Sequence, residues 1–408
     1  MRKINTRSFR VATRSSPHDI NRLIVLNLIR EYQPISRAEL ARRMKVGPAM
    51  LTRLVRELLA ENEVVETGTA LAVRGRRPTL LRIQTSGRLA VALDVRPVRT
   101  TIAVADFGGS VLARDAFPTP SRPETLVREA GARITRLLDT DGRRAACQGI
   151  GVVVPGMVDR RSGRVLYAPR LDWREVDLRD ELSRSTGLPV HVESAPIACA
   201  LARLWSYTGD SRAVNNFAYV SVSDGIGVAI VVSGEVLRGD AHTAGEFGHV
   251  SLDPYGPLCA CGRRGCWEAF ACNTATSMRY VAEVSGRQTR RVTGGRRAPI
   301  PPVEEIVRRW KRGERAAEVA LAATGREIGR GLAAVVSALN PKRIYVAGEV
   351  TAAWDLVEKP LRQALAEGTL TAAARETPVL PDSAPGEYRT LGAIALVAAP
   401  KYAAPRVG

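Results

Sequence analysis

The chain has 408 residues, 45% of them hydrophobic, and a formal net charge of +19. This length allows two or three domains with a sizeable core. The sequence contains neither an apolar run long enough to span a membrane nor the apolar core of a secretory signal, so we expect a soluble, cytoplasmic protein with no membrane partner.

The positive charge is concentrated at the N-terminal end. Residues 1–90 contain 18 Lys and Arg against 7 Asp and Glu, a net charge of +11. Such asymmetry indicates a polyanion-binding end, although an arginine-rich composition could produce it without nucleic acid. Residues 1–16 are basic and show little apolar pattern, which predicts a disordered basic arm.

Residues 17–88 have the pattern of a winged helix-turn-helix. Apolar residues recur at helical spacing over Asp19–Glu31, and Pro34 ends this first helix. A capping box of the type S-x-x-E opens a second, short helix over Ser36–Met44. After a three-residue turn, a third helix is expected over Pro48–Asn62. A helical bundle with solvated arginines is the alternative.

The third helix and the hairpin after it would form the DNA-binding surface. Small and basic residues occupy the exposed face of this helix, which suits the major groove. Strands are expected at 64–66 and 80–83, and the basic tip between them would reach the minor groove or the phosphates as a wing. The predicted contacts to a double-stranded DNA operator are Arg37, Pro48, Ala49, Met50, Thr52, Arg53, Arg56, Arg74, Arg76 and Arg77.

From Leu89 onward, strands and helices alternate in two similar sets. Residues 89–205, with a C-terminal helix at 392–408, make up the first set, and residues 206–391 the second. Strands are expected at 89–93, 101–105, 149–154, 216–222, 228–232 and 343–346, and helices at 124–138, 303–312 and 316–338. The basic, Gly- and Pro-rich stretch 286–302 predicts a flexible surface loop, with a second DNA or partner contact as the alternative.

The most specific motif lies in the second set and carries metal-ligating side chains. One histidine and three cysteines follow the spacing H-x9-C-x-C-x4-C, and they are His249, Cys259, Cys261 and Cys266. These ligand types suit a single tetrahedral zinc ion, and four protein ligands close its coordination shell, so a structural role is expected. Buried free cysteines are the alternative.

This segment resembles the signature of the ROK family of bacterial sugar kinases and sugar-responsive repressors. In that family, G-E-x-G-H precedes C-x-C-G-x-x-G-C-x-E; here the first block ends at His249 and the second at Glu268. The resemblance implies the two-lobed fold shared by actin and hexokinase, with a cleft between the lobes. Residues 17–85 also resemble the winged helix-turn-helix that ROK repressors carry and ROK kinases lack.

The phosphate-binding and catalytic motifs of ROK kinases are altered in this chain. In the kinases, glycine-rich turns bind the phosphates of ATP. In this chain bulky residues and Pro97 replace the glycines of the first turn. The second phosphate turn contains Asp224, whose carboxylate would repel phosphate. The catalytic Asp of the family's E-N-D-A motif is Ala195, so the general base is absent. The adenosine-side glycines are also altered, to a segment containing Glu349. We therefore expect no ATP binding and no catalysis.

The sugar-contacting positions are better preserved. In the family, the Glu of E-x-G-H, its His and the Glu that ends the cysteine block bind sugar hydroxyls, which implies effector contacts by Glu246, His249 and Glu268. Arg170 replaces a common Asn and would suit an anionic effector such as a sugar phosphate or sugar acid. Alternatively, the two glutamates only support the zinc loop and no small molecule binds.

These features predict a DNA-binding transcriptional regulator, a repressor of carbohydrate-related genes that responds to a sugar or sugar-derived effector. It would hold structural Zn²⁺ and bind a palindromic operator as a homodimer or homotetramer. The competing hypothesis is an ATP-dependent sugar kinase with an appended DNA-binding domain.

Overall fold

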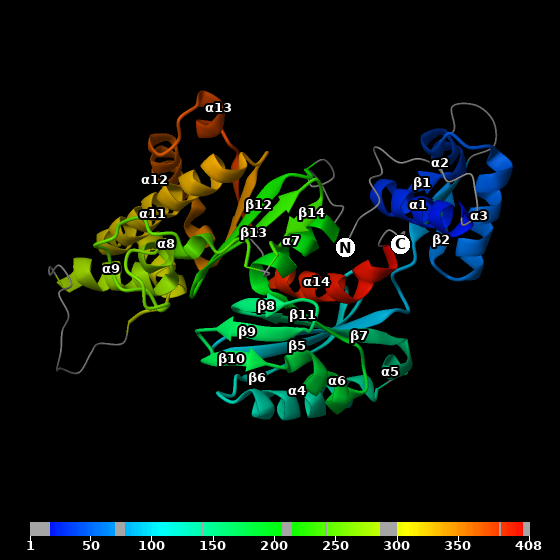
Figure 1. Cartoon of the computed structure of the whole chain (residues 1–408), viewed down its shortest axis with the longest axis horizontal. Helices are drawn as coiled ribbons and strands as arrows, with labels where there is room; N and C mark the ends of the chain where they lie inside the picture. Colours follow the sequence, from blue (N-terminus) through cyan, green and yellow to red (C-terminus); the bar gives the residue numbers. More distant parts are fainter. Residues whose placement is uncertain are drawn as a thin grey trace.

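The computed structural model describes residues 17–69, 78–140, 142–205, 214–240, 243–285, 300–382 and 385–402. The predicted basic arm, the wing arginines Arg74, Arg76 and Arg77, and most of the basic stretch 286–302 lie outside these residues. A small head and two larger lobes make up the described part (Figure 1). In this part, every helix is too short or too polar to cross a membrane.

The head has the helix-turn-helix and strands that the sequence predicts. Its elements are α1 (Pro17–Tyr32), β1 (Ile35–Ser36), α2 (Arg37–Met44), α3 (Pro48–Ala60), β2 (Val64–Thr69) and β3 (Thr79–Ile83). The Ser36 side chain accepts a hydrogen bond of 3.2 Å from the backbone N–H of Glu39, so the predicted cap of α2 is present. The three strands pair in the order β1-β3-β2, and β2 packs beside α3.

The first lobe is built on a five-stranded sheet. Its strands, in the order β11-β7-β4-β5-β6, are Val190–Ser194, Cys147–Val154, Leu89–Asp94, Arg99–Asp106 and Val111–Pro118. Helices α4 (Pro123–Leu138) and α6 (Leu178–Thr186) lie on one face, and α7 (Ala195–Trp205) and α14 (Pro385–Ala398) on the other (Figure 1). The lobe also contains α5 (Arg143–Ala146), β8 (Met157–Asp159), β9 (Arg164–Ala168) and β10 (Trp173–Val176).

The last helix differs from the prediction in its bounds. It was expected at 392–408, but α14 begins at Pro385 and is followed by the 3-10 helix η4 (Ala399–Tyr402). Glycine disfavours helix interiors, and the expected helix did not extend to the residues before Gly392. In the structure this glycine is required inside the helix, because a Cβ atom there would lie 2.2 Å from the carbonyl oxygen of Ala198.

The second lobe repeats the plan of the first. Its sheet, in the order β14-β13-β12-β15-β16, contains Glu235–Leu237, Ile226–Val232, Phe217–Val222, Ile344–Ala347 and Val379–Asp382. The other elements are η2 (Phe247–His249), α8 (Trp267–Ala271), α9 (Asn273–Ser285), α10 (Val303–Lys311), α11 (Arg315–Leu339), η3 (Glu349–Ala353), α12 (Trp354–Glu367) and α13 (Ala372–Arg375). The long apolar face of α11 is buried in the core of this lobe.

The strand ends place the candidate site between the lobes. Asp94 ends β4, Ser194 ends β11, and Ser223 directly follows β12. Ligands of α/β sheets bind outside the carboxyl ends of the strands, where loops and helix starts converge. The two sheets therefore direct polar loop residues into one shared cleft.

Candidate sugar-effector cleft, zinc-ligand set and DNA-binding face

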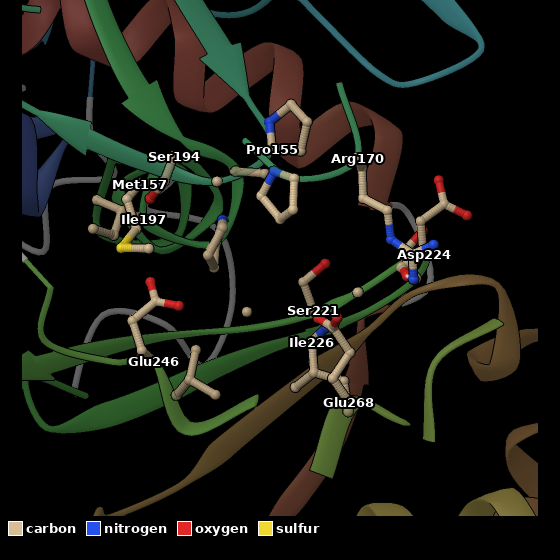
Figure 2. Close-up of a pocket in the computed structure, with 18 of the residues that line it drawn as sticks. Pro155, Met157, Arg170, Ser194, Ile197, Ser221, Asp224, Ile226, Glu246 and Glu268 are labelled. Carbon is tan, nitrogen blue, oxygen red and sulfur yellow. The ribbon is translucent and has the colours of Figure 1, made fainter. Parts of the chain in front are cut away.

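A cavity of about 220 Å³ lies between the two lobes. Figure 2 shows residues of the first lobe, among them Met157, Arg170 and Ser194, facing Asp224 and Glu246 of the second. Both lobes contribute apolar walls and a few polar groups, a composition typical of small-molecule sites.

The four predicted metal ligands come together beside this cavity. The ligand atoms of His249, Cys259, Cys261 and Cys266 all lie within 4.8 Å of one another. The Cys259 Sγ is 3.7 Å from the His249 Nδ1, and the Sγ atoms of Cys261 and Cys266 are 3.7 Å apart. Tetrahedral zinc, with bonds of about 2.0 to 2.3 Å, requires ligand atoms roughly 3.6 to 3.8 Å apart. The donor set and its spacing therefore fit one zinc ion.

A tight backbone turn makes this arrangement possible. Gly265 has a φ of +69°, and a Cβ atom there would lie 1.5 Å from the carbonyl oxygen of Asp253. Only glycine fits such a close approach in the left-handed region. The turn folds the cysteine loop back so that Ser251 pairs with Cys266 in an antiparallel bridge.

The thiols of the ligand set differ in acidity. Burial raises the pKa of Cys259 to about 12. Burial also acts on Cys261, but hydrogen bonds from Arg263 outweigh it and lower the pKa of this thiol to about 6. Because zinc binds thiolates, metal binding would release the proton of Cys259, the thiol whose pKa is raised most.

Glu268 connects the zinc-ligand set with the cleft. It is 8% exposed, and its Oε2 accepts a hydrogen bond of 2.9 Å from the backbone N–H of Ile226. Its Oε1 lies 3.8 Å from the Cys259 Sγ. One carboxylate oxygen is thus already used by β13, so the structure supports a framework role for Glu268 in addition to the effector contact that the sequence predicts.

Glu246 is the more available carboxylate of the cleft. Its side chain points toward the first-lobe side, where Met157 and Ile197 lie (Figure 2). Partial desolvation in the cleft, together with the nearby charge of Glu268, raises the pKa of Glu246 above its ordinary value. His249 lines the same cavity, so one imidazole is shared between the zinc-ligand set and the candidate effector site.

Arg170 crosses the cleft from the first lobe to the second. Its guanidinium donates a hydrogen bond to the backbone carbonyl of Asp224. Figure 2 shows the two side chains together at the edge of the cavity. The Nε atom of Arg170 is buried without a hydrogen-bond partner among the described residues. Arg170 therefore links the two lobes at the cavity that it lines.

An ion pair that the sequence did not indicate fills the first phosphate turn. Arg389 of α14 donates to Asp94, with the Arg389 Nε 2.7 Å from the Asp94 Oδ1, and Arg96 binds the other carboxylate oxygen at 3.0 Å. Burial acts to raise the pKa of Asp94, but the two arginines hold it below its ordinary value. The partners Asp94 and Arg389 are 295 positions apart, so no local pattern could reveal them.

The second phosphate turn also carries side chains with partners inside the protein. Glu349 accepts hydrogen bonds from Ser223 at 3.1 Å and from Asn273 at 3.0 Å. Asp224 is exposed at the same turn. This half of the cleft therefore presents carboxylates where a kinase would present glycine N–H groups to phosphate.

Most of the predicted DNA contacts in the described part of the head are accessible. The exposed ones are Pro48, Ala49, Thr52, Arg53 and Arg56. Met50 differs, because it is partly buried against the core of the head. Arg37 forms an ion pair of 2.6 Å with Glu66.

The head, the two lobes and the zinc-ligand set define a class of protein in which a winged helix-turn-helix is joined to a hexokinase-like domain. The chain belongs to the ROK family, whose model matches residues 90–399.

Two relatives match almost the whole chain. The xylose repressor of Caldicellulosiruptor bescii is 28% identical over 386 residues, which cover 93% of this chain and 95% of the repressor. The DNA-binding transcriptional dual regulator NagC of Escherichia coli is 27% identical over 384 residues, which cover 93% of this chain and 92% of NagC.

Two solved structures show both branches of the family. A ROK family transcriptional regulator, a homolog of the E. coli MLC protein, has a TM-score of 0.78 at 27% identity and covers 95% of this chain and 97% of its own. The ROK family glucokinase of Streptomyces griseus, in complex with glucose and AMPPNP, has a TM-score of 0.66 at 25% identity and covers 98% of its own chain but 76% of this one. The regulator thus matches a larger part of the present chain, which favours a regulator over an enzyme.

Proposed function

We propose that the chain is a transcriptional repressor of carbohydrate-related genes that binds its operator through the head and a sugar or sugar derivative in the cleft. One observation carries this proposal. A helix-turn-helix head is joined to a sugar-kinase-like domain in which charged side chains of the chain itself bind the two phosphate turns: Arg389 binds Asp94, and Glu349 binds Ser223. The name of the xylose repressor supports a sugar as the effector class, and so does that of a further relative, the N-acetylglucosamine repressor of Escherichia coli O6:H1, which is 27% identical over 384 residues.

Operator binding is tested by Arg53→Ala. Arg53 is exposed on α3, and we expect it to contact a base edge. The substitution should weaken binding to a selected operator by about 1 to 3 kcal/mol and affect random DNA much less. Both affinities are measured at one salt concentration, with Arg315→Ala, an exposed position of the second lobe, as the control. Equal losses on operator and random DNA would place Arg53 on the phosphate backbone instead.

The absence of kinase activity is the second part of the proposal. Ala195 is 7% exposed at the start of α7 and offers no group that could accept a proton from a sugar hydroxyl. Restoring a carboxylate with Ala195→Asp should not create activity, because Pro97 and Asp224 still occupy the phosphate turns. A coupled ATPase assay with a panel of sugars measures this. Phosphorylation by the unmodified chain would establish the competing kinase function.

Effector binding is assigned to Glu246, His249, Glu268 and Arg170. Glu246→Gln should abolish most of the thermal stabilisation that a bound sugar gives, because the amide is a weaker acceptor for hydroxyls than a carboxylate. Operator affinity without sugar should stay unchanged. D-xylose, N-acetylglucosamine and their phosphates serve as probes in a thermal-shift screen. Full stabilisation of the Glu246→Gln variant by a sugar that stabilises the unmodified chain would move the effector site elsewhere.

We further propose one structural Zn²⁺ per chain and a homodimer or homotetramer in the cytoplasm. Two heads in one symmetric assembly would match the two halves of a palindromic operator. Arg170→Ala should reduce the thermal stabilisation by a bound ligand most strongly when that ligand is anionic, since the guanidinium lines the cavity.

A further inference from the structure

The head packs against the body through two aromatic side chains that belong to the body. Tyr402 of η4 is 3% exposed and is part of the apolar core of the head. Its carbonyl oxygen accepts a buried hydrogen bond of 3.1 Å from Asn27 of α1. Trp205, the last residue of α7, meets Tyr402 edge to face with ring centroids 5.2 Å apart.

A cation lies against both rings. The guanidinium carbon of Arg30, a residue of α1, is 4.6 Å from the ring centroid of Trp205 and 4.9 Å from that of Tyr402. Arg30 is 7% exposed, and desolvation strengthens the attraction between a cation and aromatic rings. We call Arg30, Trp205 and Tyr402 the clasp.

The two helices that lead to the clasp both start at the cleft. Helix α7 begins at Ala195, directly after the cleft residue Ser194, and ends at Trp205. Helix α14 holds Asp94 through Arg389 near its start and continues through η4 to Tyr402. Figure 1 shows α7 beside α14, with the end of α14 reaching toward the head.

These helices are packed without room to slide past their neighbours. A Cβ atom on Gly392 of α14 would lie 2.2 Å from the carbonyl oxygen of Ala198 of α7. A Cβ atom on Gly151 of β7 would lie 1.9 Å from the carbonyl oxygen of Ala393. Because such close contacts transmit displacement, we expect α7 and α14 to shift together, and to carry β7 of the sheet with them. We call this pair the rod.

The clasp itself has space to rearrange. A second cavity, of about 90 Å³, is lined by Arg30, Trp205 and Tyr402. Arg238 also lines it, and its Nη1 lies 2.6 Å from the Oε2 of Glu193, a residue that lines the cleft. A tight rod that ends beside a cavity can shift between two packings more easily than a filled core can.

We propose that the rod couples the cleft to the position of the DNA-binding head, with the Asp94–Arg389 ion pair as its cleft end and the clasp as its head end. This inference rests on the proposed function, because it describes how a cleft ligand would change operator affinity. A ligand that shifts Asp94 or Arg389 moves the rod, and the clasp repacks around Arg30. Coupling of this kind is reciprocal, so changes at the clasp also reach the cleft.

Hydrogen–deuterium exchange of the full chain, without DNA or sugar, tests whether a change at the cleft end of the rod reaches the head. Asp94→Asn should speed up amide exchange severalfold in residues 24–32 and 399–402. The control is Asp115→Asn. Asp115 lies on the edge strand β6, and its substitution breaks ion pairs with Arg133 and Arg136 of α4. Amide exchange in residues 24–32 and 399–402 should stay unchanged in this variant. Unchanged exchange at the head in Asp94→Asn, or equal acceleration in both variants, would overturn the coupling.

A second exchange experiment tests whether a change at the clasp reaches the cleft end of the rod. Arg30→Met should speed up exchange in residues 386–390, at the cleft end of α14. The matched control is Arg22→Met, which removes an ion pair of the same helix with Glu61 but leaves the clasp intact. Acceleration at 386–390 by both variants, or by neither, contradicts the proposal. Since neither DNA nor sugar is present, such a result would leave the assignment as a regulator standing.

Discussion

Replacing Cys261 by Ser is expected to lower the zinc content of the purified chain and to destabilise the second lobe by about 4 kcal/mol or more, since loss of a structural metal is among the largest effects of single substitutions. Cys261 is one of four ligand atoms within 4.8 Å of one another. Without a bound metal, the loop that contains Cys261 would no longer be linked to His249, and the position of His249 beside the cleft would be less fixed. Zinc content by elemental analysis and denaturant unfolding of the purified chain measure both effects.

The control for this substitution is Cys147→Ser. Cys147 is 8% exposed in the core of the first lobe and far from the ligand set in sequence, so its replacement should lower stability without changing the zinc content. A Cys261→Ser protein that keeps a full equivalent of zinc, or that unfolds no earlier than Cys147→Ser, would show that the cluster is not a structural metal site. The alternative of buried free cysteines would then hold.

Features that depend on residues close together in the sequence could be predicted from the sequence. Ser36 and Glu39 are three positions apart, and their capping hydrogen bond is present at 3.2 Å. The four predicted metal ligands lie within a stretch of eighteen residues, and the structure brings their ligand atoms within 4.8 Å of one another. The paired strands predicted at 89–93 and 101–105 correspond to β4 and β5, which pair antiparallel. In each case the spacing alone constrains the geometry.

Contacts between distant segments were not readable in this way. Arg389 and Asp94 meet only after α14 folds back onto the first lobe, and Arg30 meets Tyr402 only after the C-terminal end packs on the head. The short strands β8, β9 and β10 were also missed, because three to five residues give too few repeats to show a period. The sequence therefore predicted the elements of the head, part of the elements of the two lobes and the cluster of metal-ligating side chains, but not the groups that connect the cleft with the head.

The second large effect is expected for Arg389→Met. Asp94 is 8% exposed, and removal of its main partner leaves a buried carboxylate that Arg96 alone must balance. Breaking a buried ion pair in this way costs about 3 to 5 kcal/mol of folding stability. Because the arginines lower the folded-state pKa of Asp94, the ion pair stabilises the protein above the unfolded-state pKa of Asp94. That contribution is lost as the pH falls through the folded-state pKa, so the difference between the two proteins should shrink on acidification.

Two further variants distinguish two causes of the stability loss in Arg389→Met: the unpaired buried charge of Asp94 and the loss of the arginine side chain itself. Arg326→Met removes an ion pair with Glu367 in which both side chains are 49% exposed, and it should cost less than about 1 kcal/mol. Adding Asp94→Asn to Arg389→Met should recover much of the lost stability, because the unpaired buried charge is then gone. Denaturant unfolding of the four proteins at neutral and acidic pH gives these differences. If Arg389→Met is no less stable than Arg326→Met, Asp94 does not depend on Arg389 for its charge, and the cleft end of α14 is held by packing alone.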